Sequence, residues 1–339
     1  MTTLKIYKLH FNSPLHISGL RDDGGVSLRT IQSDTLYAAI IATLAKVGTE
    51  IPQDGDLGFT LSSTFPYYQR TEDSTPTYFL PMPLQTQLPQ LKDVSKAKKV
   101  KKVQWVDSKL YDKVLAGFNF FDDTEQYIPF IQNCYLSEEV LPKDANGSSD
   151  FIKSEVSQRV LIASRNGEED ALPYYIDKIT FSDMSGLYFL AVGNTDLLDK
   201  AIELLAQEGL GTDRNVGMGF FDVQKDKLNM QLPQEAHHQM CLSMLIPESE
   251  QQLHQLLSSD QVAYDFTRRG GWITTYPYNT LRKNAIYAFM PGSVFNKTDG
   301  DELSVVGKMV NLVPGIAELA PTHPIWRNGK SIMLPIRLK

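Results

Sequence analysis

A glycine-rich stretch in the second third of the chain has the composition of a phosphate-binding loop. It reads GLGTDRNVGMGFF from Gly209 to Phe221, with four glycines, one arginine and one aspartate. It lacks the Lys and Ser or Thr of a P-loop and the G-x-G-x-x-G spacing of a dinucleotide-binding turn. A phosphate could still be held by backbone N–H groups freed by the glycines and by Arg214. The alternative is a tight helix-to-strand connection that needs positive φ, in which the glycines are purely structural.

Further basic residues stand next to glycines or in pairs along the chain. Arg21 and Arg29 flank DDGG, Arg159 and Arg165 flank VLIAS, Arg268 and Arg269 precede two glycines, and Arg282 and Lys283 precede a strand. Arginine beside glycine suits a phosphate, because the backbone can approach closely while the guanidinium forks onto the oxygens. We expect these groups to form one nucleic-acid surface from both halves of the chain. Tyr276 and Tyr278 can stack an unpaired base, whereas core packing is favoured for Trp272.

The chain is acidic overall but contains one strongly basic segment. The net charge is −7, which by itself disfavours a nucleic-acid binder. The segment 89–116, however, carries eight lysines against three aspartates. Such a run is either a solvated loop or a phosphate-attracting patch, and the sequence favours neither.

An enzymatic reading rests on one histidine. His16 follows the first predicted strand and stands near Ser18 and Arg21, so it could activate a 2′-hydroxyl in a metal-independent endoribonuclease. A histidine there is more often structural or a hydrogen-bond donor to RNA. The two cysteines have no ligand spacing, and Asp22 and Asp23 are adjacent instead of clustered. We therefore expect no catalysis, no metal and no cofactor. A protein-only scaffold, with its basic groups scattered, is a further alternative.

The elements that must position these groups follow from periodicity. Apolar residues recur at helical spacing in 194–208, with Gly209 placed to end that helix, and MGFFDVQ after the loop reads as a strand. SDTLYAAIIATLAKVG is a second amphipathic helix, with Ser33 as its predicted N-cap. Together with the strand LKIYKLHF and the strand GLYFLAVG, these elements predict a βαββαβ unit.

At 339 residues the chain predicts two domains. We expect an α+β fold of two ferredoxin-like domains. The first spans 1–231, with a large insertion at about 52–172, and the second spans 236–339, where a second helix is not evident. The N-terminus is not a secretory signal and no apolar run reaches membrane-spanning length, so a cytoplasmic protein without membrane contact is expected.

Four blocks carry a resemblance to a known family. They are PLHISGLRDDGGVSLRTIQSDTLYAAI, GLYFLAVG, GLGTDRNVGMGFF and RRGGWITTYPYNTLRKNAIYAFMPGSVF. They are similar to the RAMP superfamily of CRISPR proteins, and within it to the family of fourth subunits of the type III-A Csm interference complex. The resemblance implies RRM-related ferredoxin-like domains and a non-catalytic protein that holds the 5′ repeat-derived handle of a CRISPR RNA (crRNA). It also implies two protein partners, the large polymerase-like subunit and the adjacent backbone RAMP subunit.

The resemblance further implies a β-hairpin thumb within the insertion, which we expect in Pro142 to Lys178 with a turn at Asn166 and Gly167. The expected RNA contacts are His16, Ser18, Arg21, Arg29, Ser33, Arg159, Arg165, Gly209, Gly211, Arg214, Gly217, Gly219, Arg268, Arg269, Arg282 and Lys283.

Overall fold

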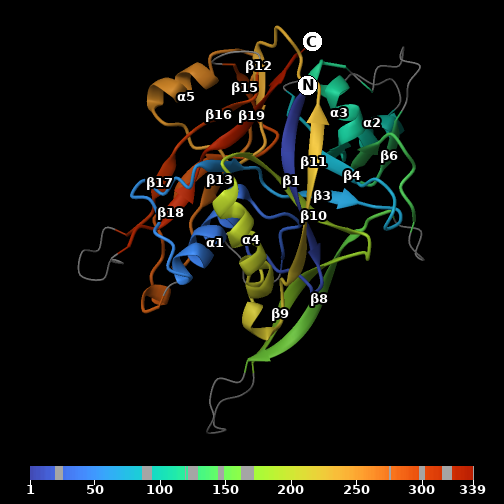
Figure 1. Ribbon diagram of the computed structural model, residues 1–339. Coiled ribbons are helices and arrows are strands. Elements are labelled where there is room, and N and C mark those ends of the chain that lie inside the picture. The colour runs from blue at the N-terminus through green and yellow to red at the C-terminus, as the bar shows by residue number, and fades with distance from the viewer. Residues whose placement is uncertain are drawn as a thin grey trace.

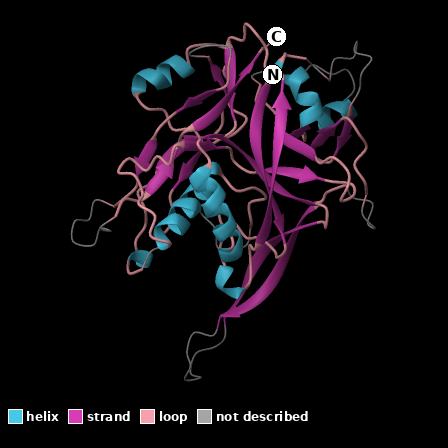
Figure 2. Cartoon of the chain, in the orientation of Figure 1, coloured by secondary structure: helices cyan, strands magenta, loops and turns pink. Residues whose placement is uncertain are grey.

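The chain folds mainly into antiparallel β-structure with few helices, as its computed structural model shows (Figure 2). The structure describes residues 1–19, 26–85, 94–118, 120, 129–143, 149–161, 172–274, 276–297, 302–314 and 323–338. Within these ranges no helix is long and apolar enough to cross a membrane.

The largest sheet is built around the first strand of the chain. Its central strands are β1 (Thr2–Phe11), β10 (Ser185–Gly193) and β11 (Phe221–Met230), with β2 (Phe59–Leu61) paired to β10. Helices α1 (Ser33–Lys46) and α4 (Asp196–Glu208) lie side by side next to these strands (Figure 1). The strands pair as β11-β1-β10-β2, all antiparallel. A ferredoxin-like unit stays a prediction, which this pairing supports.

Much of the predicted insertion continues the same sheet, an extension that periodicity missed because its strands are only three to five residues long. The added strands run in the order β3 (Phe65–Tyr68), β4 (Thr77–Pro81), β5 (Trp105–Asp107), β7 (Tyr135–Ser137) and β6 (Phe130–Gln132). Helices α2 (Val94–Val100) and α3 (Ser108–Leu115) accompany them. The lysine-rich segment therefore includes α2 and joins it to a sheet strand.

A long hairpin projects from the body of the molecule (Figure 1). Strands β8 (Ile152–Leu161) and β9 (Leu172–Phe181) pair antiparallel from Ile152↔Phe181 to Leu161↔Leu172. The sequence predicts two strands around a turn in this region. The turn itself, with Asn166 and Gly167, lies outside the described residues.

The second half contains a smaller sheet and two hairpins. The sheet has the order β15-β12-β19-β16, formed by β12 (His238–Cys241), β15 (Val294–Asn296), β16 (Ser304–Val306) and β19 (Ser331–Ile336). The hairpins pair β13 (Phe266–Arg269) with β14 (Ile286–Phe289), and β17 (Met309–Asn311) with β18 (Trp326–Asn328). In the described part of this half, α5 (Glu250–Leu256) is the one α-helix, so the second ferredoxin-like domain also stays a prediction.

The two halves share buried contacts across the expected boundary near 232–236. Leu4 and Ile6 of β1 belong to the same hydrophobic cluster as Met240 of β12 and Leu334 of β19. The prediction that Ser33 is the N-cap of α1 is wrong, because Gln32 occupies that position. The Ser33 hydroxyl instead accepts a hydrogen bond from the Met244 N–H at 2.8 Å. A residue chosen for local helix chemistry thus links the two halves of the chain.

Candidate nucleic-acid interface

The glycine loop is a helix-to-strand connection in which three glycines permit close backbone packing. Gly209 ends α4 with φ of 81°. A Cβ on Gly211 would lie 2.3 Å from the His16 carbonyl oxygen, and one on Gly219 would lie 1.9 Å from that of Leu210. At these positions the glycines are required by the tight helix-to-strand connection, because no larger residue fits without moving the backbone.

The predicted use of backbone N–H groups as phosphate donors is wrong for three of the four glycines. The N–H groups of Gly209, Gly217 and Gly219 donate inside the protein, to the carbonyls of Leu205, Arg214 and Pro14 at 2.8, 3.2 and 2.9 Å. These donors are engaged before any ligand arrives. The loop therefore depends on its arginine, and not on its amides, to attract a phosphate.

The accessible part of the loop contains the partly exposed Arg214 and the exposed residues Asn215, Val216 and Gly217. Arg214 opens a short 3-10 helix, η1 (Arg214–Val216), and its partly exposed guanidinium forms no hydrogen bond or ion pair with the residues that the structure describes. Gly217 is exposed, has φ of 90°, and would place a Cβ in open space. A ligand backbone can approach this corner without meeting a side chain at Gly217.

His16 positions the loop and is not accessible. Its ring is 2 % exposed; Nδ1 donates to the Asp177 carbonyl at 2.7 Å, so Nε2 accepts from the Ser18 hydroxyl at 3.1 Å. The His16 carbonyl accepts from Thr212 N–H at 3.0 Å. The predicted RNA contact through this ring is therefore wrong in this conformation. Ser18 itself is exposed.

The hairpin is tied to the glycine loop by Arg159. Its Nη1 lies 2.7 Å from Asp213 Oδ2, and Nη2 lies 3.6 Å from the Met218 sulfur. Arg29 likewise forms an ion pair, at 2.8 Å, with Asp150. Both arginines keep part of their surface exposed, but neither guanidinium is without a partner.

Arg269 is committed to a buried carboxylate instead of a surface ligand. Asp34, 1 % exposed in the first turn of α1, accepts from Arg269 at 2.8 and 2.9 Å and from Arg327 Nη1 at 2.5 Å. Burial alone would raise the pKa of Asp34, but the two guanidiniums outweigh it and lower the pKa to about 2. The predicted RNA contact at Arg269 is wrong because this cluster joins α1 to the second half.

Lys283 and Ser33 are also unsuited to the direct contacts that the sequence predicts. Burial and the nearby Arg327 guanidinium lower the pKa of Lys283 to about 8. Ser33 is 0 % exposed, so its predicted RNA contact is wrong. Arg327, which completes the cluster, was missed because nothing in its local sequence distinguishes it from any other strand arginine.

The exposed basic groups of the second half stand beside aromatic rings. Arg268 lies opposite Tyr287 in the β13–β14 pair, and both are exposed. The Arg282 guanidinium stacks 4.6 Å from the Trp272 ring centroid. Trp272 is 51 % exposed, so the expected core packing is wrong. Arginine and aromatic faces together suit unpaired, phosphate-bearing strands.

Not every predicted contact can be placed. Arg21 and Arg165 lie outside the described residues. The structure places His16, Arg159 and Arg214 in or against the glycine loop, whereas Arg268 lies on β13 and Arg282 in the segment between β13 and β14. In the described ranges no group of three His, Cys, Asp or Glu side chains could hold a metal ion.

Comparison with known proteins finds similarity to Csm4 proteins. Residues 234–336 match the family model of the CRISPR Csm4 C-terminal domain. The Csm4 protein of Streptococcus thermophilus is 25% identical over 312 residues, which cover 87% of this chain and 90% of that protein. The chain therefore resembles the Csm4 proteins, through its C-terminal domain and over most of its length. A Mycobacterium tuberculosis Csm4 protein is 28% identical over 180 residues, and here the match spans only about half of each, 51% of this chain and 55% of the relative.

Solved structures of complexes that contain Csm4 share the fold of this chain. A chain of the Csm3-Csm4 subcomplex of the type III-A interference complex superposes with a TM-score of 0.62 at 18% identity, covering 99% of this chain and 100% of that one. A chain of a Csm1-Csm4 cassette in complex with cA4 gives 0.58 at 20% identity, covering 100% and 99%. The mixed α and β architecture of the Csm4 family therefore extends over the whole chain.

Proposed function

We propose that this chain is the non-catalytic crRNA-binding subunit of a type III-A CRISPR effector complex and holds the 5′ repeat-derived handle. The observation that carries the proposal is the Arg214 corner. A guanidinium without a partner among the described residues stands beside an open glycine, on a loop fixed by His16 and Arg159. Such a fixed cation suits a phosphate of an RNA backbone.

The second half supplies the base-stacking part of the surface. Trp272 with its stacked Arg282, and the exposed pair Arg268 and Tyr287, offer π faces and positive charge without hydrogen-bond readout. Both halves would follow the RRM-related ferredoxin-like scheme. The acidic net charge is compatible with this, since basic groups gather locally while other faces meet proteins.

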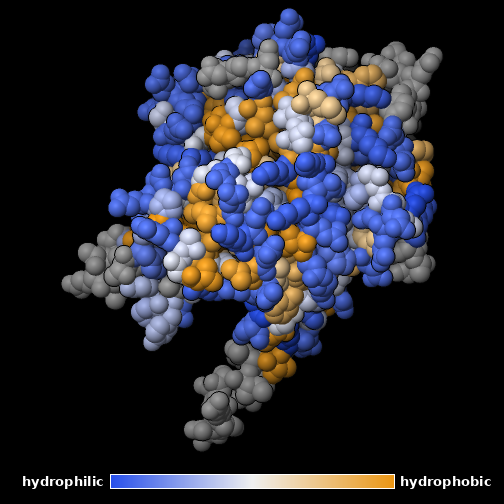
Figure 3. Space-filling model, viewed as in Figure 1, coloured by the Kyte–Doolittle hydropathy of each residue, from blue (hydrophilic) through white to orange (hydrophobic). Residues whose placement is uncertain are grey.

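The partners follow from the relatives, whose solved structures combine Csm4 with Csm1 and with Csm3. We place this chain between a large polymerase-like subunit and an adjacent backbone RAMP subunit, in a cytoplasmic assembly. The β8–β9 hairpin would act as the thumb. Val156, Val160 and Tyr175 are exposed on it, and apolar and polar side chains alternate along the extension below the body in Figure 3. Apolar side chains at an RNA bend can pack against unstacked bases.

A non-catalytic role fits the position of His16. A general base must reach the proton that it removes, whereas this ring is 2 % exposed and both nitrogens are engaged. We therefore assign His16 to holding the loop, and we set the endoribonuclease alternative aside.

The test is to purify the chain with its co-expressed neighbouring subunits, extract the bound RNA and sequence its ends. RNAs that share one short repeat-derived 5′ end support handle binding. An intact assembly without RNA contradicts the proposal and supports the protein-only scaffold, in which the glycine loop is only a connector.

A further inference from the structure

A cavity of about 560 Å³ lies away from the glycine loop, where three parts of the chain meet. Phe65 comes from β3, Trp105 from β5 within the lysine-rich segment, and Asp265 and Met290 from the second half. Its volume lies within the range of small-molecule and cofactor sites, about 300–1,000 Å³. The cavity is therefore large enough for a nucleobase with its sugar.

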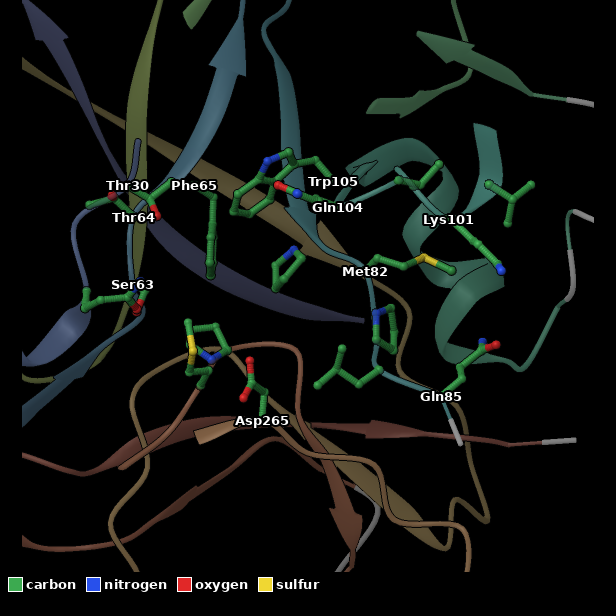
Figure 4. Close-up of a pocket in the computed structure, with 18 residues that line it drawn as sticks. Thr30, Ser63, Thr64, Phe65, Met82, Gln85, Lys101, Gln104, Trp105 and Asp265 are labelled. Atoms are coloured by element: carbon green, nitrogen blue, oxygen red, sulfur yellow. The ribbon is translucent and has the colours of Figure 1, made fainter. Parts of the chain in front are cut away.

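The walls of the cavity combine apolar side chains with polar ones, among them Gln32, Thr64 and Gln104. The rings of Phe65 and Trp105 have centroids 5.9 Å apart, and Pro81, Leu84 and Met290 continue the lining. Phe65 and Asp265 extend toward one another from opposite sides (Figure 4). Phe65 is 1 % exposed, so the partly exposed Trp105 ring is the face on which a planar heteroaromatic ring can stack, with its edges against proline and methionine.

Asp265, which is exposed, contributes one carboxylate to the lining of the cavity. Its Oδ1 accepts from the Phe266 N–H at 2.8 Å, and its carboxylate forms no ion pair with the described residues. The second oxygen is left for a ligand. A carboxylate accepts from the amino group of a base, as Asp and Glu do from the N4 amino group of cytosine. Adenine, cytosine and guanine carry such a group, and uracil does not.

One lysine lines the cavity, and three more are its near neighbours in the chain. Lys101 lines the cavity, and Lys98, Lys99 and Lys102 are exposed on α2 and just after it. Positive charge at the rim attracts a phosphate-bearing strand and disfavours the alternative occupant, an arginine or lysine side chain of a partner protein that would pair with Asp265. The lysine run, ambiguous in sequence, stands beside a cavity of matching chemistry.

We propose that this cavity takes one unpaired nucleobase of the bound RNA, whose exocyclic amino group donates to Asp265 while its phosphates lie along Lys101 and its neighbours. The inference rests on the proposed RNA-binding function and adds a base-reading site to it. Affinity comes from the lysines and the aromatic wall, and discrimination against uracil comes from Asp265.

The experiment selects random single-stranded RNA octamers on the full-length chain and sequences the bound pool. Wild type should deplete uracil about tenfold at one position, the discrimination typical of a good base contact. Asp265→Asn should abolish that depletion, since an amide both donates and accepts. Asp260→Asn is the matched control: it removes a nearby exposed charge that does not line the cavity, and it should keep the preference. Lys101→Gln should weaken binding at every sequence and leave the preference intact.

The outcomes separate the base site from the proposed function. A wild-type chain that retains no RNA contradicts RNA binding itself. RNA retained without positional preference, or with a preference unchanged in Asp265→Asn, overturns the base site alone. Loss of a co-purifying subunit in Asp265→Asn, with RNA selection unaltered, overturns it as well and assigns the cavity to a protein side chain.

Discussion

Arg159 of the β8–β9 hairpin and Asp213 of the glycine loop form an ion pair with 2.7 Å between Nη1 and Oδ2. The pair joins two segments that the sequence separates by 54 residues, and Arg159 also reaches the Met218 sulfur. The hairpin and the loop therefore meet at one place, next to Arg214. An RNA held at Arg214 would lie near the base of the hairpin.

Breaking this pair should loosen the loop more than it destabilises the protein. Both side chains are partly exposed, so Arg159→Ala should lower the free energy of unfolding by less than about 1 kcal/mol. Amide hydrogen exchange in 210–218 should become faster, because the loop loses its outer anchor. Arg29→Ala, which breaks another exposed pair, is the control and should leave that segment unchanged. Equal exchange in both variants would show that the hairpin does not hold the loop.

Substitutions of the loop glycines should differ in their effect on stability, depending on whether the added Cβ meets backbone atoms. Gly219→Ala forces a Cβ to within 1.9 Å of a backbone oxygen and should prevent stable folding or lower the melting temperature strongly. Gly217→Ala meets no atom and should cost only the positive-φ penalty, about 1–2 kcal/mol. Thermal unfolding measures both. Similar losses in the two variants would contradict the packing described for the loop.

The buried cluster around Asp34 should be a major contribution to stability. Asp34→Asn leaves Arg269 and Arg327, 14% and 7% exposed, without their counter-charge and should cost about 3–5 kcal/mol. Because the folded pKa of about 2 lies below the ordinary 3.8, this stabilisation is present above pH 3.8 and is lost as the pH falls toward 2. Denaturant titration at neutral pH checks the magnitude.

The control for that experiment is Asp56→Asn, which breaks a more exposed pair with Lys330 and should cost no more than about 1 kcal/mol. Two variants of equal stability would mean that the buried carboxylate is dispensable.

Lys283 should destabilise the fold near neutral pH. Its folded pKa of about 8 lies below the ordinary 10.5, so between these values the unfolded chain binds more protons and stability rises with pH. Lys283→Met should raise the melting temperature at pH 7, and the gain should shrink between pH 8 and 10.5. A melting-temperature difference that stays constant across this window would contradict burial as the cause of the low pKa.

Local pattern predicted the elements that have strong periodicity. The helix expected in 194–208 is confirmed as α4, with Gly209 at its end, because Leu198, Ala201, Ile202 and Leu205 all face the core. The short strands β3 to β7 were missed, since three to five residues show no usable alternation and two of the strands contain proline.

Partners far apart in sequence could not be predicted. Asp34 lies at the start of α1 and accepts from the Thr35 N–H at 2.8 Å, but its main partners are 235 and 293 residues away. Arg269 and Arg282 look alike in sequence, but Arg269 pairs with the buried Asp34 carboxylate and Arg282 stacks on the exposed Trp272 ring. Only tertiary contacts distinguish the two arginines. Arg214 as an RNA contact stays a prediction, which its lack of a partner among the described residues supports.

The central claim is that Arg214 holds an RNA phosphate. The direct measurement is the salt dependence of RNA binding for wild type and Arg214→Ala, with Arg70→Ala as an exposed control arginine away from the loop. Arg214→Ala should bind all sequences more weakly, with a slope of log K against log salt that is smaller by about 0.7, and Arg70→Ala should bind like wild type. Identical affinity and slope in Arg214→Ala and wild type would contradict that claim.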